Sequence, residues 1–161
     1  MSELTHIGPD GRARMVDISD KATTDRLAIA RGKIFMQPET LSLSLGGTTK
    51  KGDPVGISEL AGIMGAKRTS DLIPLCHPLP LTSVKVEIGP DETQSALIVT
   101  ARAKTSGQTG VEMEALTAVS IACLTLYDML KAADKAMKIS DIELIEKLGG
   151  KSGHYQKTES P

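Results

Sequence analysis

A cysteine and a histidine are adjacent in the proline-rich segment DLIPLCHPLP. Pro74 and Pro78 flank the pair, and each proline favours an extended backbone at the residue that precedes it. The backbone N–H groups between the two prolines therefore cannot form helical hydrogen bonds, and they need other partners, such as a bound ligand. The alternative is that the segment is a structural connection in which Cys76 and His77 have no role in chemistry.

An acid and a lysine, Asp128 and Lys131, are three residues apart in the segment YDMLK, so they lie on one face of a predicted helix. Such a pair is often only a weak surface ion pair. Asp128, however, follows thirteen residues without a charge, Ala115–Tyr127, and we therefore expect it to lie near a buried surface. Buried ionisable pairs have shifted proton affinities, as acid–base catalysts require.

Two carboxylates, Glu112 and Glu114, lie in the segment TGVEMEAL, at the start of the same predicted helix. Thr109 and Glu112 have the spacing of a capping box, and both carboxylates would be stabilised by the positive end of the helix dipole. These structural roles are a sufficient explanation. The functional alternative is that the carboxylates bind the N–H donors of a guanine-like base or position a water for acid–base chemistry.

Basic residues form short groups along the chain. These are KKGD (50–53), AKRT (66–69), Lys147 and GGKSG (149–153). The last group is not a P-loop, because Ile145 occupies the position where that motif needs its first glycine. It is either a mobile tail or a loop whose glycines fold over a phosphate.

The spacing of these groups constrains where a common ligand could bind. Glu114 and Asp128 are fourteen residues apart on one predicted helix, and this corresponds to roughly 21 Å along its axis. They cannot contact one small ligand within a single chain. If both serve one ligand, the site lies between subunits, with Glu114 of one protomer facing Asp128 and Lys131 of another.

The elements that must position these residues mix helices and strands. Alternating apolar residues at 84–88 and 97–103 predict an antiparallel hairpin with one buried face. Helices are predicted at 21–31, 38–45, 57–67 and from Val111 to about Met137, and further strands at 15–19, 33–36 and 142–148. This order predicts an α+β sandwich, with helices packed on one face of an antiparallel sheet. We expect a single domain with a flexible arm at 1–14 and a flexible Gly-rich tail at 149–161.

Two of the predicted helices indicate close packing. In the helix at 57–67, apolar residues recur at helical spacing, and Gly62 and Gly65 thin one face for close approach. The long helix is apolar nearly all round between Ala115 and Tyr127, so it must be covered on more than one side. A second subunit is a natural cover in a chain of this size, and we predict an oligomer.

The composition excludes several classes of function. The 161 residues carry a net charge of −1 and only 2% aromatic residues, so neither nucleic-acid binding nor attachment to an anionic membrane is expected. The two cysteines, Cys76 and Cys123, form no CxxC pair and have no ligands at zinc-finger spacing, so neither a metal site nor a disulfide framework is expected. No charged-then-apolar leader begins the chain, and we expect a cytoplasmic protein with a small-molecule ligand.

Taken in order, the motifs of this chain resemble those of the cyclic pyranopterin monophosphate synthase family of molybdenum cofactor (molybdopterin) biosynthesis, the MoaC proteins. The motifs are MVDIS, KKGD, AKRTSDLIPLCHPL, TGVEMEALTA, YDM and GGKSG, and they cover residues 15–153. Two slight departures are Pro54 after KGD, which could alter the pose of Lys51, and Gly65 where Ala is common.

The resemblance implies a ferredoxin-like α+β subunit that assembles as a homohexamer, a trimer of dimers, with the active site between subunits. It implies a lyase that converts 3′,8-cyclo-7,8-dihydroguanosine 5′-triphosphate to cyclic pyranopterin monophosphate, a pterin, with loss of pyrophosphate. This chemistry needs proton transfers and stabilisation of anions, and no cofactor or metal is expected.

The resemblance also assigns roles to residues at matching positions. Asp128 is the family's active-site residue, and Lys51 and Lys131 are the acid/base lysines. The residues expected to contact the base or line the substrate are Leu75, Cys76, His77, Glu112, Met113 and Glu114. Those proposed for the triphosphate are Lys67, Arg68, Lys147 and Lys151, with Arg26 as a further candidate.

The rival interpretation is a non-catalytic module, a small oligomeric α+β domain that binds a nucleotide or a partner protein. It accounts for the apolar helix and the basic groups, but it does not use Asp128, Lys131 and His77 together.

Overall fold

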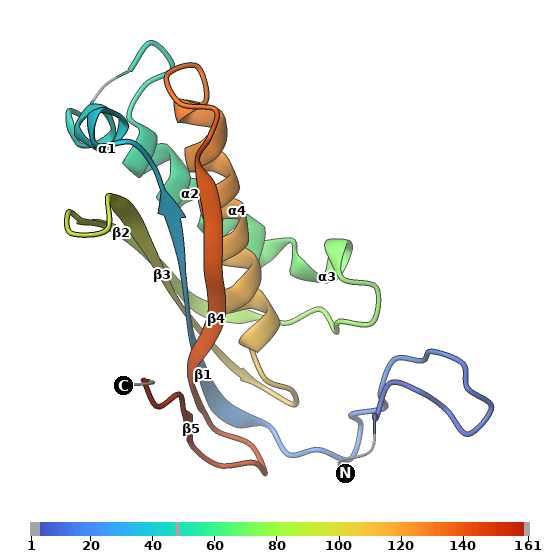
Figure 1. The fold of residues 1–161 in the computed structure, drawn as a ribbon. Helices are drawn as coiled ribbons and strands as arrows, with labels where there is room; N and C mark the ends of the chain where they lie inside the picture. Colours follow the sequence, from blue (N-terminus) through green and yellow to red (C-terminus); the bar gives the residue numbers. More distant parts are fainter. Residues whose placement is uncertain (1–3, 48, 160–161) are drawn as a thin grey trace.

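The computed structural model describes residues 4–47 and 49–159, which form one antiparallel sheet with helices packed on one face (Figure 1). The strands are β1 (Thr24–Phe35), β2 (Leu81–Asp91), β3 (Ala96–Gly107), β4 (Lys138–Leu148) and β5 (Tyr155–Gln156), in the spatial order β2-β3-β1-β4-β5. The helices are α1 (Pro38–Leu45), α2 (Pro54–Lys67), α3 (Thr69–Leu72) and α4 (Glu112–Leu130). The predicted α+β, ferredoxin-like class is confirmed. Residues 1–3 of the predicted arm and 160–161 of the predicted tail lie outside the described residues.

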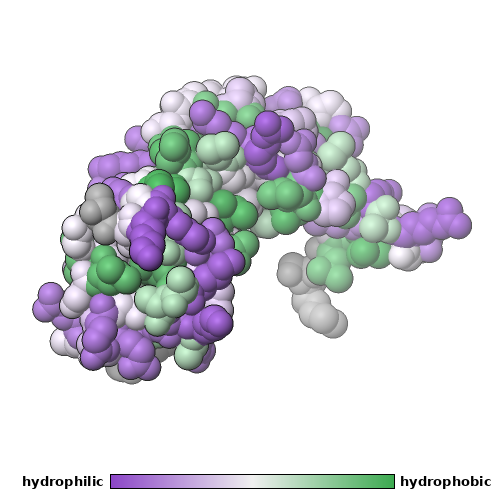
Figure 2. Space-filling view, turned by 90° about the horizontal axis from the view of Figure 1, so that it is seen from above, coloured by the Kyte–Doolittle hydropathy of each residue, from purple (hydrophilic) through white to green (hydrophobic). Residues whose placement is uncertain are grey.

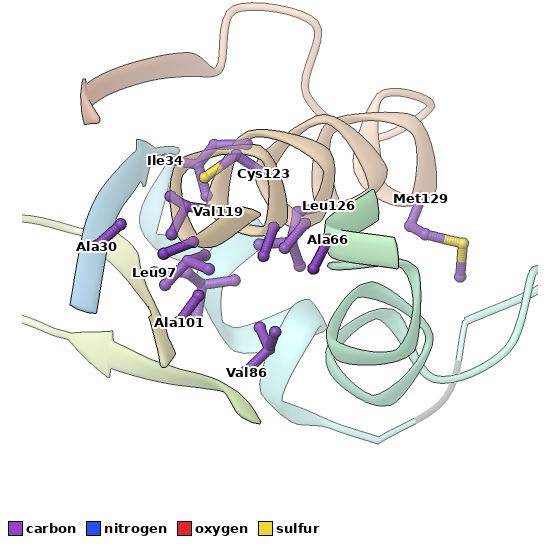
Figure 3. Packing of buried hydrophobic residues seen from close by; sticks show 14 of the residues in the cluster. Ala30, Ile34, Ala66, Val86, Leu97, Ala101, Val119, Cys123, Leu126 and Met129 are labelled. Atoms are coloured by element: carbon purple, nitrogen blue, oxygen red, sulfur yellow. The ribbon is translucent and has the colours of Figure 1, made fainter. Parts of the chain in front are cut away.

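The hairpin of β2 and β3 is confirmed, and it supplies one wall of the core. Leu97, Val99, Ala101 and Ala103 alternate along β3 and are fully buried, as their period of two predicts. Helix α4 lies over β3 and β1, and its side chains meet this face of the sheet (Figure 3).

Residues 21–31 were predicted as a helix, and that prediction is wrong, because residues 24–35 form β1, the strand between β3 and β4. Ala28 and Ala30 are good helix formers, but both are fully buried beneath the helical layer. Gly32 continues this small-residue face, since a Cβ there would lie 2.7 Å from Cγ1 of Val119 on α4. Close approach of α4 to the sheet thus overrides local helix propensity. The strand predicted at 15–19 is also wrong, because this segment has no regular secondary structure.

Helix α4 is shorter than predicted and begins without the expected cap. It ends at Leu130, where the N–H groups of Ala133 and Asp134 both donate to the Leu130 carbonyl and turn the chain toward β4. Val111 is the N-cap and forms no side-chain cap bond, so the capping box predicted with Thr109 is wrong. By length and composition α4 could span a membrane, but more than half of that stretch is buried inside the fold.

Helix α2 is confirmed, but the face it buries is its small-residue face. A Cβ on Gly62 would lie 2.9 Å from the Ala118 carbonyl oxygen, and one on Gly65 would lie 2.8 Å from Cγ1 of Ile121. The glycines therefore let α2 and α4 approach closely. Pro54 occupies the first position of α2, after the Asp53 cap, where proline is favoured because its missing N–H is not needed.

Apolar side chains of α2 and α4 remain at the surface as a consequence. The exposed fractions of Ile57, Leu60 and Met64 are 39%, 59% and 59%, and that of Leu124 on α4 is 58%. We call these four residues the α2 stripe. Figure 2 looks down on the end of the molecule that carries α1 and shows apolar groups between polar ones there, with the N-terminal arm extending to one side.

Candidate functional site

The proline loop, residues 73–80, forms one wall of a cavity of ≈ 680 Å³. The start of α4 forms a second wall, and the N-terminal arm contributes a third. The lining residues are His6, Ala13, Ile73, Pro74, Leu75, Cys76, His77, Thr109, Gly110, Glu112 and Met113. Of the six residues predicted to contact the base or line the substrate, all but Glu114 line this cavity, and Glu114 contacts Cys76 from behind.

One hydrogen bond ties the end of the proline loop to β3, and another closes a turn within the loop. The Thr105 hydroxyl donates to the Pro80 carbonyl at 2.7 Å, and the Cys76 N–H donates to the Ile73 carbonyl at 3.1 Å. Nε2 of His77 lies 2.6 Å from the Val16 carbonyl, which can only accept, so Nε2 carries the proton. In the neutral ring, Nδ1 of His77 is then left as an acceptor.

Glu114 is a buried carboxyl group behind the cavity wall, with an exposed fraction of 3%. Burial, reinforced by the charge of Glu112, raises its pKa to about 7. The Cys76 thiol lies 3.8 Å from Oε1 of Glu114 and donates to it, while Oε2 is buried with no partner among the described residues. Glu114 can therefore gain or lose a proton near neutral pH. Burial and the neighbouring Glu114 raise the pKa of Cys76 to about 11, so its thiol is not a nucleophile at that pH.

A second cavity, of ≈ 410 Å³, adjoins the first and shares Thr109, Gly110 and Glu112 with it. Its cationic groups are the side chains of Lys21, Arg26, Lys147 and Lys151. Lys147 forms an ion pair with Glu112, and both side chains are about three-quarters buried. The predicted capping box does not form, because Val111 and not Thr109 is the N-cap, and the Glu112 carboxylate lies beside Gly110 and pairs with Lys147.

The glycines of GGKSG shape the second cavity. Gly149 and Gly150 have φ values of +95° and +78°, which residues other than glycine rarely adopt. A Cβ on Gly150 would also overlap the Arg26 guanidinium, whose Nε donates to the Gly107 carbonyl at 3.0 Å. The glycines thus allow the chain to pass close to Arg26, which brings Lys147 and Lys151 to the same cavity.

The opposite end of α4 carries a second cluster, in which Asp128 lies between two lysines. Nζ of Lys131 lies 2.9 Å from Oδ1 of Asp128, and Nζ of Lys51 lies 3.6 Å from Oδ2 and 2.9 Å from the Asp128 carbonyl. The hydrogen bond and charge of Lys131, with the charge of Lys51, hold the pKa of Asp128 below its usual range. Asp128 in turn raises the pKa of Lys131, which therefore keeps its proton.

The expectation that Asp128 lies near a buried surface is not met within a single chain, where 58% of its side chain is exposed. Asp128 is on the face of α4 turned away from the sheet, whereas the neighbouring Met129 and Leu130 are buried. Most of the thirteen uncharged residues before it are covered by the sheet and α2, but Asp128, like Leu124 four residues earlier, lies on the uncovered face of the helix.

The two clusters lie at opposite ends of α4 (Figure 1), so one chain does not bring them together. Lys67 and Arg68 lie at the end of α2 and line neither of the two cavities described above. Arg68 forms an exposed ion pair with Asp71 at 3.4 Å. His6 and Ala13 also line the first cavity. The sequence gives no signal for this role, because only the path of the arm brings the two residues to the cavity.

Comparison with known proteins identifies the family of the chain. Residues 15–150 match the MoaC family. A protein of Dinoroseobacter shibae named cyclic pyranopterin monophosphate synthase is 61% identical over 156 residues, which cover 97% of this chain and 99% of the relative. A protein of the same name from Cereibacter sphaeroides strain KD131 is 58% identical over 156 residues, covering 97% and 98%. The prediction made from the motifs is confirmed: the chain belongs to the MoaC family.

Proposed function

We propose that this chain is a cyclic pyranopterin monophosphate synthase, a lyase that converts 3′,8-cyclo-7,8-dihydroguanosine 5′-triphosphate to cyclic pyranopterin monophosphate and pyrophosphate. The observation that carries this proposal is identity of 58–61% to proteins of that name over nearly the whole chain. Incubation with the cyclised nucleotide should yield a product that is fluorescent after oxidation, as pterins are. Binding of the nucleotide without conversion would instead favour the non-catalytic module.

In the proposed mechanism, Lys131 is the principal proton donor. Its hydrogen bond to Asp128 raises its pKa, so the ammonium form is available when substrate binds. Lys51 lies on the other side of the same carboxylate and is placed for later proton transfers. Asp128 orients both lysines and is not itself the proton donor, because its pKa is lowered.

The two adjoining cavities suggest how the rest of the substrate binds. The proline loop and Met113 form a wall for the base, with Glu114 behind it and Glu112 at the boundary between the cavities. The triphosphate would bind in the second cavity, where Arg26, Lys147 and Lys151 converge. Removing one of these charges, as in Lys147→Ala, should raise KM more than it lowers kcat, and an unchanged KM would count against this assignment.

The assembled site would lie between subunits of a homohexamer. The α2 stripe supports this, because four large apolar side chains on adjoining helices are left uncovered in the single chain. A neighbouring subunit seated nearby could bring the Asp128 cluster to another chain's cavities, and Lys67 and Arg68 toward the triphosphate. Sedimentation at monomer mass would contradict the oligomer. We also propose that the enzyme acts in the cytoplasm, without nucleic acid, membrane or cofactor.

A further inference from the structure

Asp134 is a buried carboxylate in the turn between α4 and β4, with an exposed fraction of 8%. Its Oδ2 accepts hydrogen bonds from the Gln37 N–H at 2.9 Å and from the Thr40 hydroxyl at 3.2 Å. Its Oδ1 accepts from the Ala136 N–H at 3.1 Å. A buried carboxylate is tolerated only when its oxygens are hydrogen-bonded, and here the bonds join the turn to the first residues of α1.

The turn that contains Asp134 also contains Lys131. The Lys131 N–H donates to the Tyr127 carbonyl at 2.8 Å, and the Asp134 N–H donates to the Leu130 carbonyl at 3.1 Å. The turn is further held by the Tyr127 hydroxyl, which donates to the Lys135 carbonyl at 2.9 Å. The position of Asp134 is therefore coupled to that of Lys131.

The element that Asp134 anchors leads to Lys51. Helix α1 ends at Leu45, and the connection to α2 carries Lys51, whose ammonium group reaches Asp128. The N-cap of α1, Gln37, forms no side-chain cap bond, so the negative charge of Asp134 stabilises that helix end from a distant part of the chain. Figure 1 shows α1, the connection and the turn after α4 together at one end of the molecule.

We propose that Asp134 is a positioning residue, which fixes the separation of Lys51 and Lys131 on either side of Asp128. The inference rests on the proposed catalytic role of these two lysines. Without the carboxylate, α1 and the turn are no longer tied to each other, and the lysines occupy a wider range of positions around the substrate. Misplacing a reacting group by about 1 Å can reduce a rate by about 100-fold.

The first test is Asp134→Asn. This substitution keeps the volume of the side chain, but it replaces one acceptor oxygen with an amide N–H₂, which cannot accept a hydrogen bond from the donor that it faces. Turnover should fall about 10- to 100-fold, with KM changed by less than about threefold. Ile34→Val, which removes a methyl group from the core, is the control for a general loss of stability, with all assays performed well below the unfolding temperature. The proposal is overturned if Asp134→Asn keeps wild-type kcat, or loses no more kcat than Ile34→Val.

A second pair of variants decides the matter if Asp134→Asn does not fold. Thr40→Val removes one bond to the carboxylate and should lower kcat, whereas Thr40→Ser keeps the hydroxyl and should retain wild-type kcat. Equal activity of the two would refute the positioning role. Lys131→Ala separates this inference from the proposed function. If Lys131→Ala is active, the catalytic role of Lys131 is wrong. If Lys131→Ala is inactive but Asp134→Asn is fully active, only the positioning role of Asp134 is wrong.

Discussion

At the residue scale, one carboxylate organises the proposed proton-transfer groups. Asp128 contacts the ammonium groups of both Lys51 and Lys131, yet all three side chains are about half exposed in the single chain. The ion pairs alone therefore contribute little to folding. Their geometry is better explained by positioning of the lysines than by stability.

Replacing Lys131 tests its role as proton donor. Lys131→Ala should lower kcat by about 10²- to 10⁴-fold, as expected for loss of a general acid, while the sedimentation behaviour stays unchanged. Lys135→Ala, which removes an exposed lysine from the same turn, is the matched control and should retain activity. Near-normal turnover of Lys131→Ala would remove the assignment.

Glu114 gives a pH-dependent prediction. Its pKa is raised from 4.5 to about 7 in the folded chain, so folding favours the protonated form. The stability that this form provides is complete below pH 4.5 and is lost as the pH rises through 7. The unfolding free energy of the wild type, measured against Glu114→Gln, should therefore fall by on the order of 3 kcal/mol between pH 4.5 and 8.

Denaturant titrations at fixed protein concentration would measure this difference. Glu92→Gln, on the exposed turn between β2 and β3, is the control for removing a carboxylate from the surface. If the difference in unfolding free energy between the wild type and Glu114→Gln does not vary with pH, burial does not penalise the charged form of Glu114, and the prediction is contradicted.

At the element scale, the packing of α2 on α4 depends on glycine. Gly62→Ala would place a methyl group 2.9 Å from a backbone carbonyl oxygen, which cannot rotate away. The expected cost is about 1–3 kcal/mol of unfolding free energy, the range for overpacking a core. Gly89→Ala is the control, because its Cβ would meet no atom within 4 Å, and it should change stability by less than about 0.5 kcal/mol. Equal stability of the two variants would contradict the close contact.

The elements differ in how far the sequence could predict them. The β2–β3 hairpin was predictable because its buried face follows a period of two with large apolar residues. Of strand β1, only the end was predicted, by the strand at 33–36. The rest was not, because Ala28, Ala30 and Gly32 form its helix-facing side, and such small residues give a weak alternation. Their burial depends on α4 and on two neighbouring strands that are remote in sequence. The end of α4 was also missed, because the turn after Leu130 is fixed by Asp134 and α1 and not by a local stop signal.

The candidate site was predictable in its residues more than in its arrangement. The motifs indicated the lysines at 51 and 131 and the proline loop, and the helix spacing predicted that Glu114 and Asp128 lie apart. The contribution of His6 and Ala13 was not predictable, because it depends on the path of an arm that is held partly by the bond from His77 to Val16.

At the scale of the whole molecule, α4 separates the two halves of the proposed active site. The cavities proposed for the base and the triphosphate lie at its first turn, and the proposed proton-transfer cluster lies at its last turn. In a symmetric dimer with an isologous interface, the first turn of one α4 could face the last turn of the other, and two complete sites would form. The exposed α2 stripe gives such an assembly apolar surface to bury.

Mixed oligomers measure this directly. One variant, Lys131→Ala, lacks the proton donor, and the other, Arg26→Ala with Lys147→Ala, lacks the cationic cavity. The two are refolded together and assayed at a substrate concentration well below the raised KM of the second variant. Half of the dimers should contain both variants, and each of these should have one intact site, so activity should recover to about a quarter of the wild-type value. A mixture no more active than its separate components would contradict a site shared between subunits.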